Sequence, residues 1–504
     1  MRAKQHLAAI TRIVFLAITV VLQAGILVGM YYFFNRKIAY FYVICTIISF
    51  FVVLYILRED TNPTYKIPWI ILNLLLPGFG GIIYLMFGRV RFSRYEKART
   101  KKLSRVSVET LHNRPMAKIA PPKEMKTQTE YLRRNAGAPL YTNTEVTYYP
   151  LGEDFFAALV PELEKAEHFI FLEYFIIDSG KMWDTVEEIL VRKAAQGVDV
   201  RLMYDDIGCI GMLPGNFDKL MEKQGIACRT FNRFQNVFSS RFNNRDHRKI
   251  CVIDGNVGFT GGINLADEYI NEYPKHGHWK DTAIKLRGDA VFSLTVMFLS
   301  LWDHEVDKVE DMNKYLPTEK VEAGGYVQPY CDMPGDTEYV AETVYRNMIN
   351  RADRYVYITT PYLIIDNEMI NALATAAKSG VDVRIITPGI PDKKVTYMLT
   401  RSYYAVLLRA GVKIYEYTPG FIHAKGFVSD DRCAVVGTIN LDYRSLCHHV
   451  ECAAWMCDVP AVGEIKADFL ETQKKCREIT PEICRAFIKH PALISILRLF
   501  APLF

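Results

Sequence analysis

The fold of this 504-residue chain is decided by the stretch Asn244-Arg-Asp-His-Arg-Lys-Ile-Cys-Val-Ile-Asp-Gly255. Within it, His247, Lys249 and Asp254 begin a pattern, H-x-K-x4-D-x6-G-[GT]-x-N, that ends at Asn264. The same pattern returns 176 residues later, with the same spacing, at His423, Lys425, Asp430, Thr438 and Asn440. A single H-x-K-x4-D would arise by chance in such a chain with a probability on the order of a few per cent. Two copies with matching tails therefore indicate a duplicated unit.

The duplication extends beyond the motif. Gly197-Val-Asp-Val-Arg201 recurs unchanged as Gly380-Val-Asp-Val-Arg384, and an apolar strand precedes each copy, within 166–178 and 352–366. Each half then adds two further strands, at 226–231 and 249–253 and at 412–417 and 425–428. Strands alternating with helical stretches predict βαβ units and a largely parallel buried sheet in each half. The predicted fold class is therefore α/β.

Three uncharged apolar stretches occupy the N-terminal fifth of the chain. They are Ile13–Phe34, Ile38–Leu57 and Ile67–Phe87, of 22, 20 and 21 residues. Each is long enough to cross a hydrocarbon core of roughly 30 Å as a helix, so we expect transmembrane helices. Alternatives are a cleaved signal peptide for the first stretch and buried core helices for all three. The third contains prolines and glycines, so it could instead be kinked or re-entrant.

The charge is unevenly distributed along the chain. The whole chain carries +5, of which residues 1–88 carry +5 and residues 89–126 carry +9, leaving −9 for the remainder. A basic flank directly after an apolar segment marks the cytoplasmic side and attracts anionic lipid headgroups. Nucleic acid is the other polyanion such a stripe could bind, but the acidic body argues against it. If all three stretches cross, the basic N-terminus and the basic flank fall on opposite sides, so we expect the first or third stretch to fail to cross.

Eleven cysteines occur without C-x-x-C pairs or clusters flanked by histidine. This arrangement suits a reducing compartment and suggests no zinc site. We therefore expect the body of the protein to face the cytoplasm and to need no metal or other cofactor.

The duplicated residues are those that substitution at a phosphodiester requires. One histidine can attack phosphorus to form a phosphohistidine, while the other donates a proton to the leaving group and later deprotonates the acceptor. Lys249 and Lys425 would offset phosphate charge, and Asn264 and Asn440 would donate hydrogen bonds to it. The residues themselves leave open which histidine attacks.

Over residues 140–504 the chain resembles the phospholipase D superfamily, whose signature is this repeated motif. Within it, several segments resemble the bacterial cardiolipin synthases: 244–255, 260–269, 279–282, 360–362, 436–446 and 498–504, with 76–89 in the apolar region. The resemblance implies two pseudo-twofold-related lobes that bring both motifs into one site. The expected domains are a membrane region (1–92), a basic linker (93–139), a first lobe (140–325) and a second lobe (326–504).

The resemblance also implies residue roles. His247 would be the nucleophile and His423 the acid/base, with Asp281 orienting His247 and Glu451 orienting His423. Asp254 and Asp430 belong to the signature, and we expect them to hold the strand-to-turn geometry and the lysines. Thr438 stands where serine is commoner and would help to bind phosphate. The neighbouring His448 and His449 could be spectators or could adjust the pKa of His423.

The implied activity joins two phosphatidylglycerol molecules into cardiolipin and releases glycerol, at the cell membrane. A lipid hydrolase of the same type is the first alternative, because water can resolve the same intermediate. A membrane-tethered nuclease is the second, although no nucleic-acid partner is expected. The expected partners are phosphatidylglycerol and anionic membrane lipids.

Overall fold

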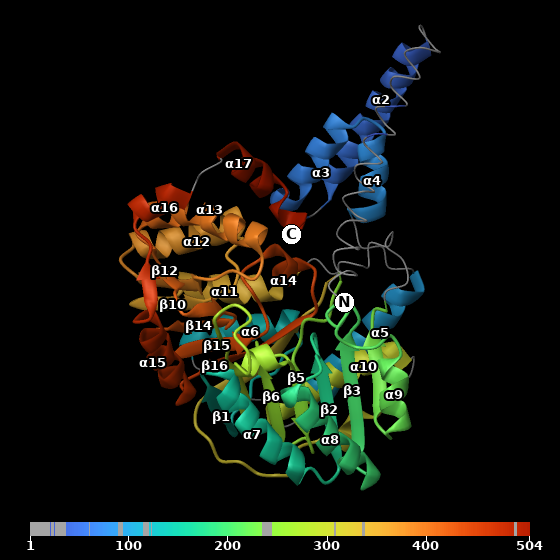
Figure 1. The fold of residues 1–504 in the computed structure, drawn as a ribbon, viewed down its shortest axis with the longest axis vertical. Coiled ribbons are helices and arrows are strands. Elements are labelled where there is room, and N and C mark those ends of the chain that lie inside the picture. The colour runs from blue at the N-terminus through green and yellow to red at the C-terminus, as the bar shows by residue number, and fades with distance from the viewer. Residues whose placement is uncertain are drawn as a thin grey trace. The chain divides into compact units, whose positions relative to one another are not determined.

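The computed structural model describes residues 21, 25, 37–59, 61–88, 94–113, 120–121, 123–233, 244–306, 309–334, 338–487 and 491–503. It divides into two units (Figure 1). An N-terminal unit holds residues 1–91 with segments 209–214 and 234–242, and a main unit holds the rest. Each is described by itself.

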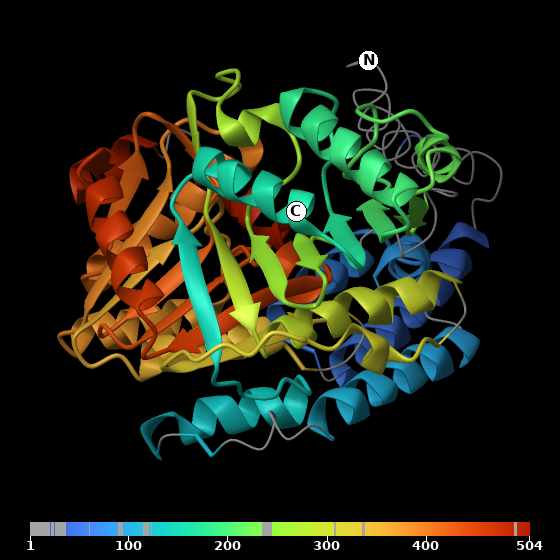
Figure 2. The same ribbon diagram turned by 90° about the horizontal axis from the view of Figure 1, so that it is seen from below.

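The main unit contains two sheets (Figure 2). Their strand orders match. The first runs β1-β8-β6-β5-β2-β3-β4, and the second runs β9-β16-β15-β14-β10-β11-β12 with β17 added at its edge. The strands of the first are β1 Thr144–Tyr149, β2 Phe169–Tyr174, β3 Asp199–Asp205, β4 Ala227–Phe231, β5 Ile250–Ile253, β6 Val257–Gly261 and β8 Ala283–Gly288. Those of the second are β9 Tyr326–Asp332, β10 Tyr355–Thr359, β11 Asp382–Pro388, β12 Lys413–Tyr417, β14 Gly426–Ser429, β15 Cys433–Gly437, β16 Glu451–Cys457 and β17 Cys476–Glu478. The mixed α/β fold and the duplicated lobes are confirmed.

The prediction that the sheets are largely parallel was wrong. In the first sheet only β2, β3 and β4 run parallel, while β5, β6, β8 and β1 join through antiparallel pairs. The second sheet repeats this arrangement. The reason is the turn after each motif strand, which needs no crossover helix. Asp254 and Gly255 adopt positive φ of 50° and 69° and reverse the chain directly into β6, as tight hairpin turns require.

Helices cover both sheets. They are α7 Gly152–Lys165, α8 Lys181–Ala195, α9 Phe217–Lys223, α10 Val291–Val306, α11 Val340–Asn350, α12 Asn367–Lys378, α13 Lys394–Ala410, α14 Tyr443–Cys447, α15 Ala461–Gln473, α16 Pro481–Phe487 and α17 Pro491–Leu499. Short 3-10 turns are η2 Lys123–Met125, η4 Asp267–Ile270, η5 Met312–Tyr315 and η6 Ala501–Leu503. The helix α10 is buried along nearly its whole length.

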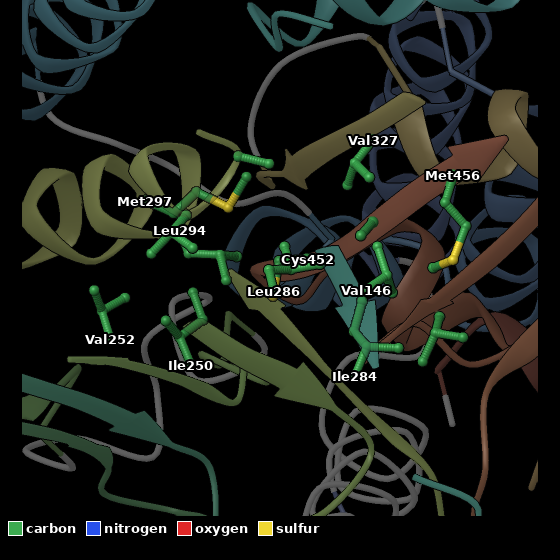
Figure 3. Close-up of a cluster of buried hydrophobic side chains, with 14 of the residues drawn as sticks. Val146, Ile250, Val252, Ile284, Leu286, Leu294, Met297, Val327, Cys452 and Met456 are labelled. Carbon is green, nitrogen blue, oxygen red and sulfur yellow. The ribbon is translucent and has the colours of Figure 1, made fainter. Parts of the chain in front are cut away.

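One hydrophobic core joins the two lobes (Figure 3). Ile250 and Ile284 of the first sheet belong to it, and so do Leu294 of α10 and Cys452 and Met456 of the second sheet. All five are at most 1% exposed. Because both sheets contribute to one core, the lobes fold as one body and hold their facing edges in fixed register.

The predicted basic linker, residues 93–139, contains two helices. They are α5 Arg94–His112, which packs along α10 (Figure 2), and α6 Lys126–Asn135, which packs on α11 and β9. In α5, Leu103 and Leu111 are buried while Lys101 and Lys102 are exposed. The segment is thus attached to the main unit by an apolar face and leaves basic side chains in solvent.

In the N-terminal unit, α2 Lys37–Arg58 covers the second predicted apolar stretch. It is the one helix in the described part of the chain that is long and apolar enough to cross a membrane, over Tyr40–Arg58. The first stretch, 13–34, lies outside the described residues apart from 21 and 25. The third is not one continuous helix, because α3 Pro63–Leu75 and α4 Phe79–Phe87 are separated at Pro77 and Gly78. Gly78, with φ of 84°, is the N-cap of α4 and redirects the chain between the two helices.

Candidate active site

The two motif histidines lie where the lobes meet. His247 precedes β5 of the first lobe, yet its backbone N–H donates to the carbonyl of Val450 in the second lobe at 2.9 Å. His423 precedes β14 of the second lobe, and its N–H donates to the carbonyl of Lys280 in the first at 2.7 Å. The backbone of each lobe therefore fixes the histidine of the other, as pseudo-twofold packing requires.

The carboxylates that orient the histidines are exchanged between the lobes. Nδ1 of His247 lies 2.9 and 3.0 Å from the two carboxylate oxygens of Glu451. Nδ1 of His423 lies 2.6 Å from Oδ2 of Asp281. Asp281 and Glu451 were correctly singled out, but the predicted pairing, Asp281 with His247 and Glu451 with His423, was wrong.

The backbone explains the exchange. Asp281 follows β7 His278–Lys280, which pairs in parallel with β13 Gly420–Ile422, the strand that leads to His423. Glu451 follows Val450, which bridges to Asp246 beside His247. The backbone segment that carries each carboxylate therefore pairs with the motif of the other lobe. The number of residues between a carboxylate and either histidine does not show which histidine it contacts.

The two lysines lie beside the histidines. Nζ of Lys249 donates to the carbonyl of His247, and Nζ of Lys425 donates to the carbonyl of His423. Nζ of Lys425 also lies 2.7 Å from Nδ1 of His423. Nδ1 of His423 cannot both donate to Asp281 and accept from Lys425. A carboxylate can only accept, so Nδ1 carries the proton towards Asp281 and Nε2 carries the free lone pair.

Burial and crowded positive charge lower the basicity of the whole cluster. Burial, then Lys249 and Lys425, hold the pKa of His247 well below its usual value. Burial and Lys425 lower the pKa of His423 to about 4, although Asp281 opposes the shift. Burial lowers the pKa of Lys249 to about 8 and that of Lys425 to about 7. Burial alone would raise the pKa of Asp281, but Lys425 and His423 outweigh it and the pKa lies below its ordinary value. A bound phosphodiester would add negative charge here and favour the charged forms of both lysines.

The predicted phosphate-binding residues are buried, and each already has a protein contact. Oδ1 of Asn264 accepts from the N–H of Ile176 at 3.0 Å and Nδ2 donates to the Tyr269 hydroxyl at 2.6 Å. Nδ2 of Asn440 lies 3.3 Å from Asp442, while its Oδ1 is buried without a hydrogen-bond partner.

Thr438 contacts a carboxylate. Its hydroxyl donates to Glu451 and accepts from the N–H of Cys452 at 3.1 Å. In this structure Thr438 therefore supports the carboxylate that orients His247, and phosphate binding by it stays a prediction.

The two motif aspartates lie at the far ends of their strands. Asp254 follows β5 while His247 precedes it, a separation of seven residues or roughly 20 Å along a strand. Its carboxylate accepts from the N–H groups of Glu167, His168 and Phe169 at 2.7–2.8 Å. Asp430 does the same for Asp353, Arg354 and Tyr355 at 2.8–2.9 Å. These hydrogen bonds support the expected structural role, because each aspartate holds its motif hairpin to the start of the neighbouring strand, β2 or β10. They do not link the aspartates to the lysines.

His449 lies beside His247, which sequence reasoning did not anticipate. Their ring centroids are 5.5 Å apart, and Nδ1 of His449 lies 3.7 Å from Glu451. Both ring nitrogens of His449 are buried without a hydrogen-bond partner, and burial lowers its pKa to about 3. Of the two possibilities that the sequence left open, a spectator or an influence on His423, neither included this contact of His449 with His247. Ligand atoms of His247, His449 and Glu451 lie within 4.8 Å of one another and could hold a metal ion, which would have to displace the proton on Nδ1 of His247.

Aromatic rings surround the two histidines. Phe175 lies 5.0 Å from His247, centroid to centroid, while Tyr269 and Trp279 each lie 5.6 Å and Phe421 5.8 Å from His423. Such walls exclude water from the imidazoles and fix their planes. No spacing rule in the sequence pointed to these four residues.

The comparisons with known proteins agree with this arrangement. The family model described as "Cardiolipin synthase, PLD-like domain" matches residues 159–273 and 345–472, and "Phospholipase_D-nuclease N-terminal" matches 47–89. The cardiolipin synthase of a Geobacillus species is 34% identical over 482 residues, covering 91% of this chain and 92% of that protein. The cardiolipin synthase of Halalkalibacterium halodurans is 33% identical over 478 residues, covering 92% and 93%.

Two further matches extend the comparison. A Streptococcus mutans protein is 45% identical over 458 residues, covering 90% of this chain and 99% of that protein. The crystal structure of phosphatidylserine synthase from Haemophilus influenzae superposes with a TM-score of 0.56 at 13% identity, covering 75% of this chain and all of that one, and shows a shared fold. By sequence over nine-tenths of its length, the chain belongs to the cardiolipin synthase family of the phospholipase D superfamily.

Proposed function

We propose that this chain is a membrane-bound cardiolipin synthase that transfers a phosphatidyl group from one phosphatidylglycerol to another through a phosphohistidine. The observation that carries the proposal is the reciprocal pair of buried histidine–carboxylate contacts, His247–Glu451 and His423–Asp281, with a lysine beside each histidine. Two oriented imidazoles with a lysine beside each suit double displacement at a phosphodiester.

His247 is the better nucleophile of the two. Attack requires a neutral imidazole, and burial together with Lys249 and Lys425 holds the pKa of His247 well below its usual value, although Glu451 lies 2.9 Å from its Nδ1. His423 is held at 2.6 Å by Asp281, whose charge favours the protonated form. A bound phosphodiester adds negative charge and raises the pKa of both, so that His423 can hold the proton that the leaving group needs.

The first step forms a bond from Nε2 of His247 to phosphorus and breaks the bond from phosphorus to the glycerol headgroup oxygen. The departing alkoxide takes the proton of His423 and leaves as glycerol. Glu451 stabilises the positive charge that develops on His247, while Lys249 and Lys425 offset charge on the non-bridging oxygens.

The second step reverses the roles. The headgroup hydroxyl of a second phosphatidylglycerol loses its proton to His423 and attacks phosphorus, and the bond to His247 breaks. Cardiolipin is the product and both histidines are restored. Water in place of that hydroxyl would give phosphatidic acid, so a hydrolase differs from a synthase only in the acceptor.

We place the active site at the cytoplasmic face of the cell membrane. The α2 helix anchors the chain, and the solvent-exposed basic side chains of α5 follow the apolar region closely in sequence, so anionic headgroups can attract them. Phosphatidylglycerol is itself anionic, so the same charge that holds the enzyme at the surface favours its substrate over neutral lipids.

Product analysis with the purified full chain on phosphatidylglycerol vesicles tests the proposal. Cardiolipin with an equimolar amount of glycerol is expected, and His247→Ala and His423→Ala should each abolish it. His168→Ala, at an exposed histidine, is the matched control and should retain activity. Phosphatidic acid as the main product would identify a hydrolase, and DNA cleavage without cardiolipin would identify a nuclease.

A further inference from the structure

The third apolar stretch folds back on itself. We propose that α3 and α4 form a re-entrant hairpin that enters and leaves the bilayer on the side where α2 ends at Arg58. The partner of this surface is the hydrocarbon of one leaflet. The inference concerns only the N-terminal unit and goes beyond the proposed activity.

The α3 helix runs antiparallel to α2. Nζ of Lys66, near the start of α3, donates to the carbonyls of Leu57 and Glu59 at the end of α2, at 3.2 Å for Leu57. About two turns further along α3, Nδ2 of Asn73 donates to the carbonyl of Ser49 at 2.8 Å. Ser49 lies nine residues before Arg58, or about 14 Å at 1.5 Å per residue. The end of α3 is therefore near the middle of the span that α2 makes.

The α4 helix then returns. A Cβ on Gly80 would lie 2.4 Å from Cα of Asn73, so the first turn of α4 touches the last turn of α3. Further along, the rings of Trp69 and Tyr84 lie 5.5 Å apart. The contacts move backwards along α3 as they move forwards along α4, so the two helices are antiparallel.

The contacts of α4 with α2 give the same direction. The N–H of Gly78 donates to the hydroxyl of Ser49 at 2.9 Å, whereas a Cβ on Gly81 would meet Val52 at 3.2 Å. Val52 is nearer than Ser49 to Arg58. The α4 helix therefore heads towards the end of α2 at which α3 began.

The lengths and polarity fit one leaflet. The 13 residues of α3 and the nine of α4 span about 20 and 14 Å, each less than the roughly 30 Å core. The polar break between them is covered by protein, because Ser49 and Asn73 are 3% and 0% exposed, and a non-helical backbone at membrane depth needs such cover. At the tip, Leu74 and Leu75 are 61% and 70% exposed and would face hydrocarbon.

The hairpin removes the conflict in the charge pattern. With 63–87 re-entrant, the loop at Arg58–Lys66 and the basic segment from Arg89 onwards share one side. If 13–34 crosses as its sequence predicts, Arg2, Lys4 and Arg12 fall on that side as well. Only Arg36 and Lys37 lie across the membrane, as the positive-inside rule favours.

Cysteine labelling in intact cells tests the topology. Asn62→Cys precedes the hairpin, Lys101→Cys follows it in α5, and Lys37→Cys marks the other end of α2. The parent chain with its 11 cysteines gives the background. An impermeant maleimide should leave both Asn62→Cys and Lys101→Cys at background until the cells are lysed, and should label Lys37→Cys. Labelling of Asn62→Cys and Lys101→Cys from opposite sides, or of Asn62→Cys and Lys37→Cys from the same side, would overturn the hairpin.

Cross-linking tests the fold of the hairpin itself, in a Cys45→Ser background because Cys45 contacts Gly78. Trp69→Cys with Tyr84→Cys should be joined by a short bismaleimide, with the linked peptide identified by mass spectrometry. In a continuous helix the two positions would be about 22 Å apart. Ile67→Cys with Ile82→Cys has the same spacing and outward-facing side chains, 48% and 54% exposed, and is the control. Equal yields for the two pairs would refute the antiparallel arrangement.

Discussion

Glu451→Gln gives a sharp test of the exchanged carboxylates. The substitution keeps the size of the side chain and an oxygen acceptor for His247, but removes the charge that lies 2.9–3.0 Å from Nδ1. A hydrogen bond to a charged group contributes about 1 kcal/mol more than one to a neutral group. Stabilising the imidazolium formed during attack adds up to about 4 kcal/mol at an effective dielectric of 20. A loss of about 2–4 kcal/mol corresponds to a turnover lower by roughly 30- to 1,000-fold.

A phosphodiester with a nitrophenolate leaving group identifies which histidine each carboxylate serves. Nitrophenolate departs without a proton, so its release needs the nucleophile and not the general acid. His423→Ala should therefore release nitrophenolate in a single turnover while making no cardiolipin, and His247→Ala should do neither. Glu451→Gln should follow the profile of His247→Ala in milder form, and Asp281→Asn that of His423→Ala.

The comparison does not depend on which histidine attacks, because each carboxylate variant is matched to a histidine variant. Glu464→Gln, on the exposed side of α15, is the control for loss of a glutamate charge and should behave as the parent. If Glu451→Gln shared its profile with His423→Ala, the cross-lobe pairing would be refuted.

Three further outcomes are expected. Thr438→Val should lower the free energy of unfolding by about 1–3 kcal/mol and should also lower turnover, because Glu451 and the N–H of Cys452 lose a buried partner. Thr438→Ser should restore stability in thermal melts and turnover in vesicle assays. Asp254→Ala should cost about 2 kcal/mol of stability, since three backbone N–H groups lose a charged acceptor, while turnover per folded molecule stays near that of the parent; a loss of turnover at unchanged stability would contradict the structural role. As pH rises through about 7 to 8, kcat/KM for phosphatidylglycerol should fall because Lys425 and Lys249 lose their charge. Their contribution to the free energy of unfolding should rise over the same pH range, because the lysines of the unfolded chain still hold their protons. A melting temperature that instead falls in parallel with kcat/KM would disprove the assigned protonation.

The repeated motif predicted the duplicated lobes, because strand-length apolar runs and matching spacings are local patterns. The shared site and the choice of Asp281 and Glu451 as orienting carboxylates came from the resemblance to the phospholipase D superfamily. The sheet direction did not follow, because a buried apolar strand reads the same whether its neighbour is parallel or antiparallel. Positive φ at Asp254 and Gly255 reverses the chain. The dipeptide Asp-Gly is itself a hairpin signal, but the pattern of apolar strands alone does not contain it.

The exchange of carboxylates is a long-range feature of a different kind. It depends on β7 pairing with β13 and on the bridge from Asp246 to Val450, contacts between segments more than 140 residues apart. No interval along the chain encodes which of two symmetric partners is nearer. The apolar hairpin was harder to predict for a related reason, since composition gives the length of an apolar run but not whether it turns at Gly78.

The one difference between the two motif tails is explained by the exchanged pairs. Gly262 and Thr438 occupy equivalent positions, each behind the carboxylate of its own lobe. A Cβ on Gly262 would lie 2.0 Å from Oδ1 of Asp281, so only glycine fits there. Glu451 is one methylene longer, and in that lobe the equivalent position holds Thr438, whose hydroxyl donates to the carboxylate. The residue at this position is thus matched to the length of the neighbouring acid.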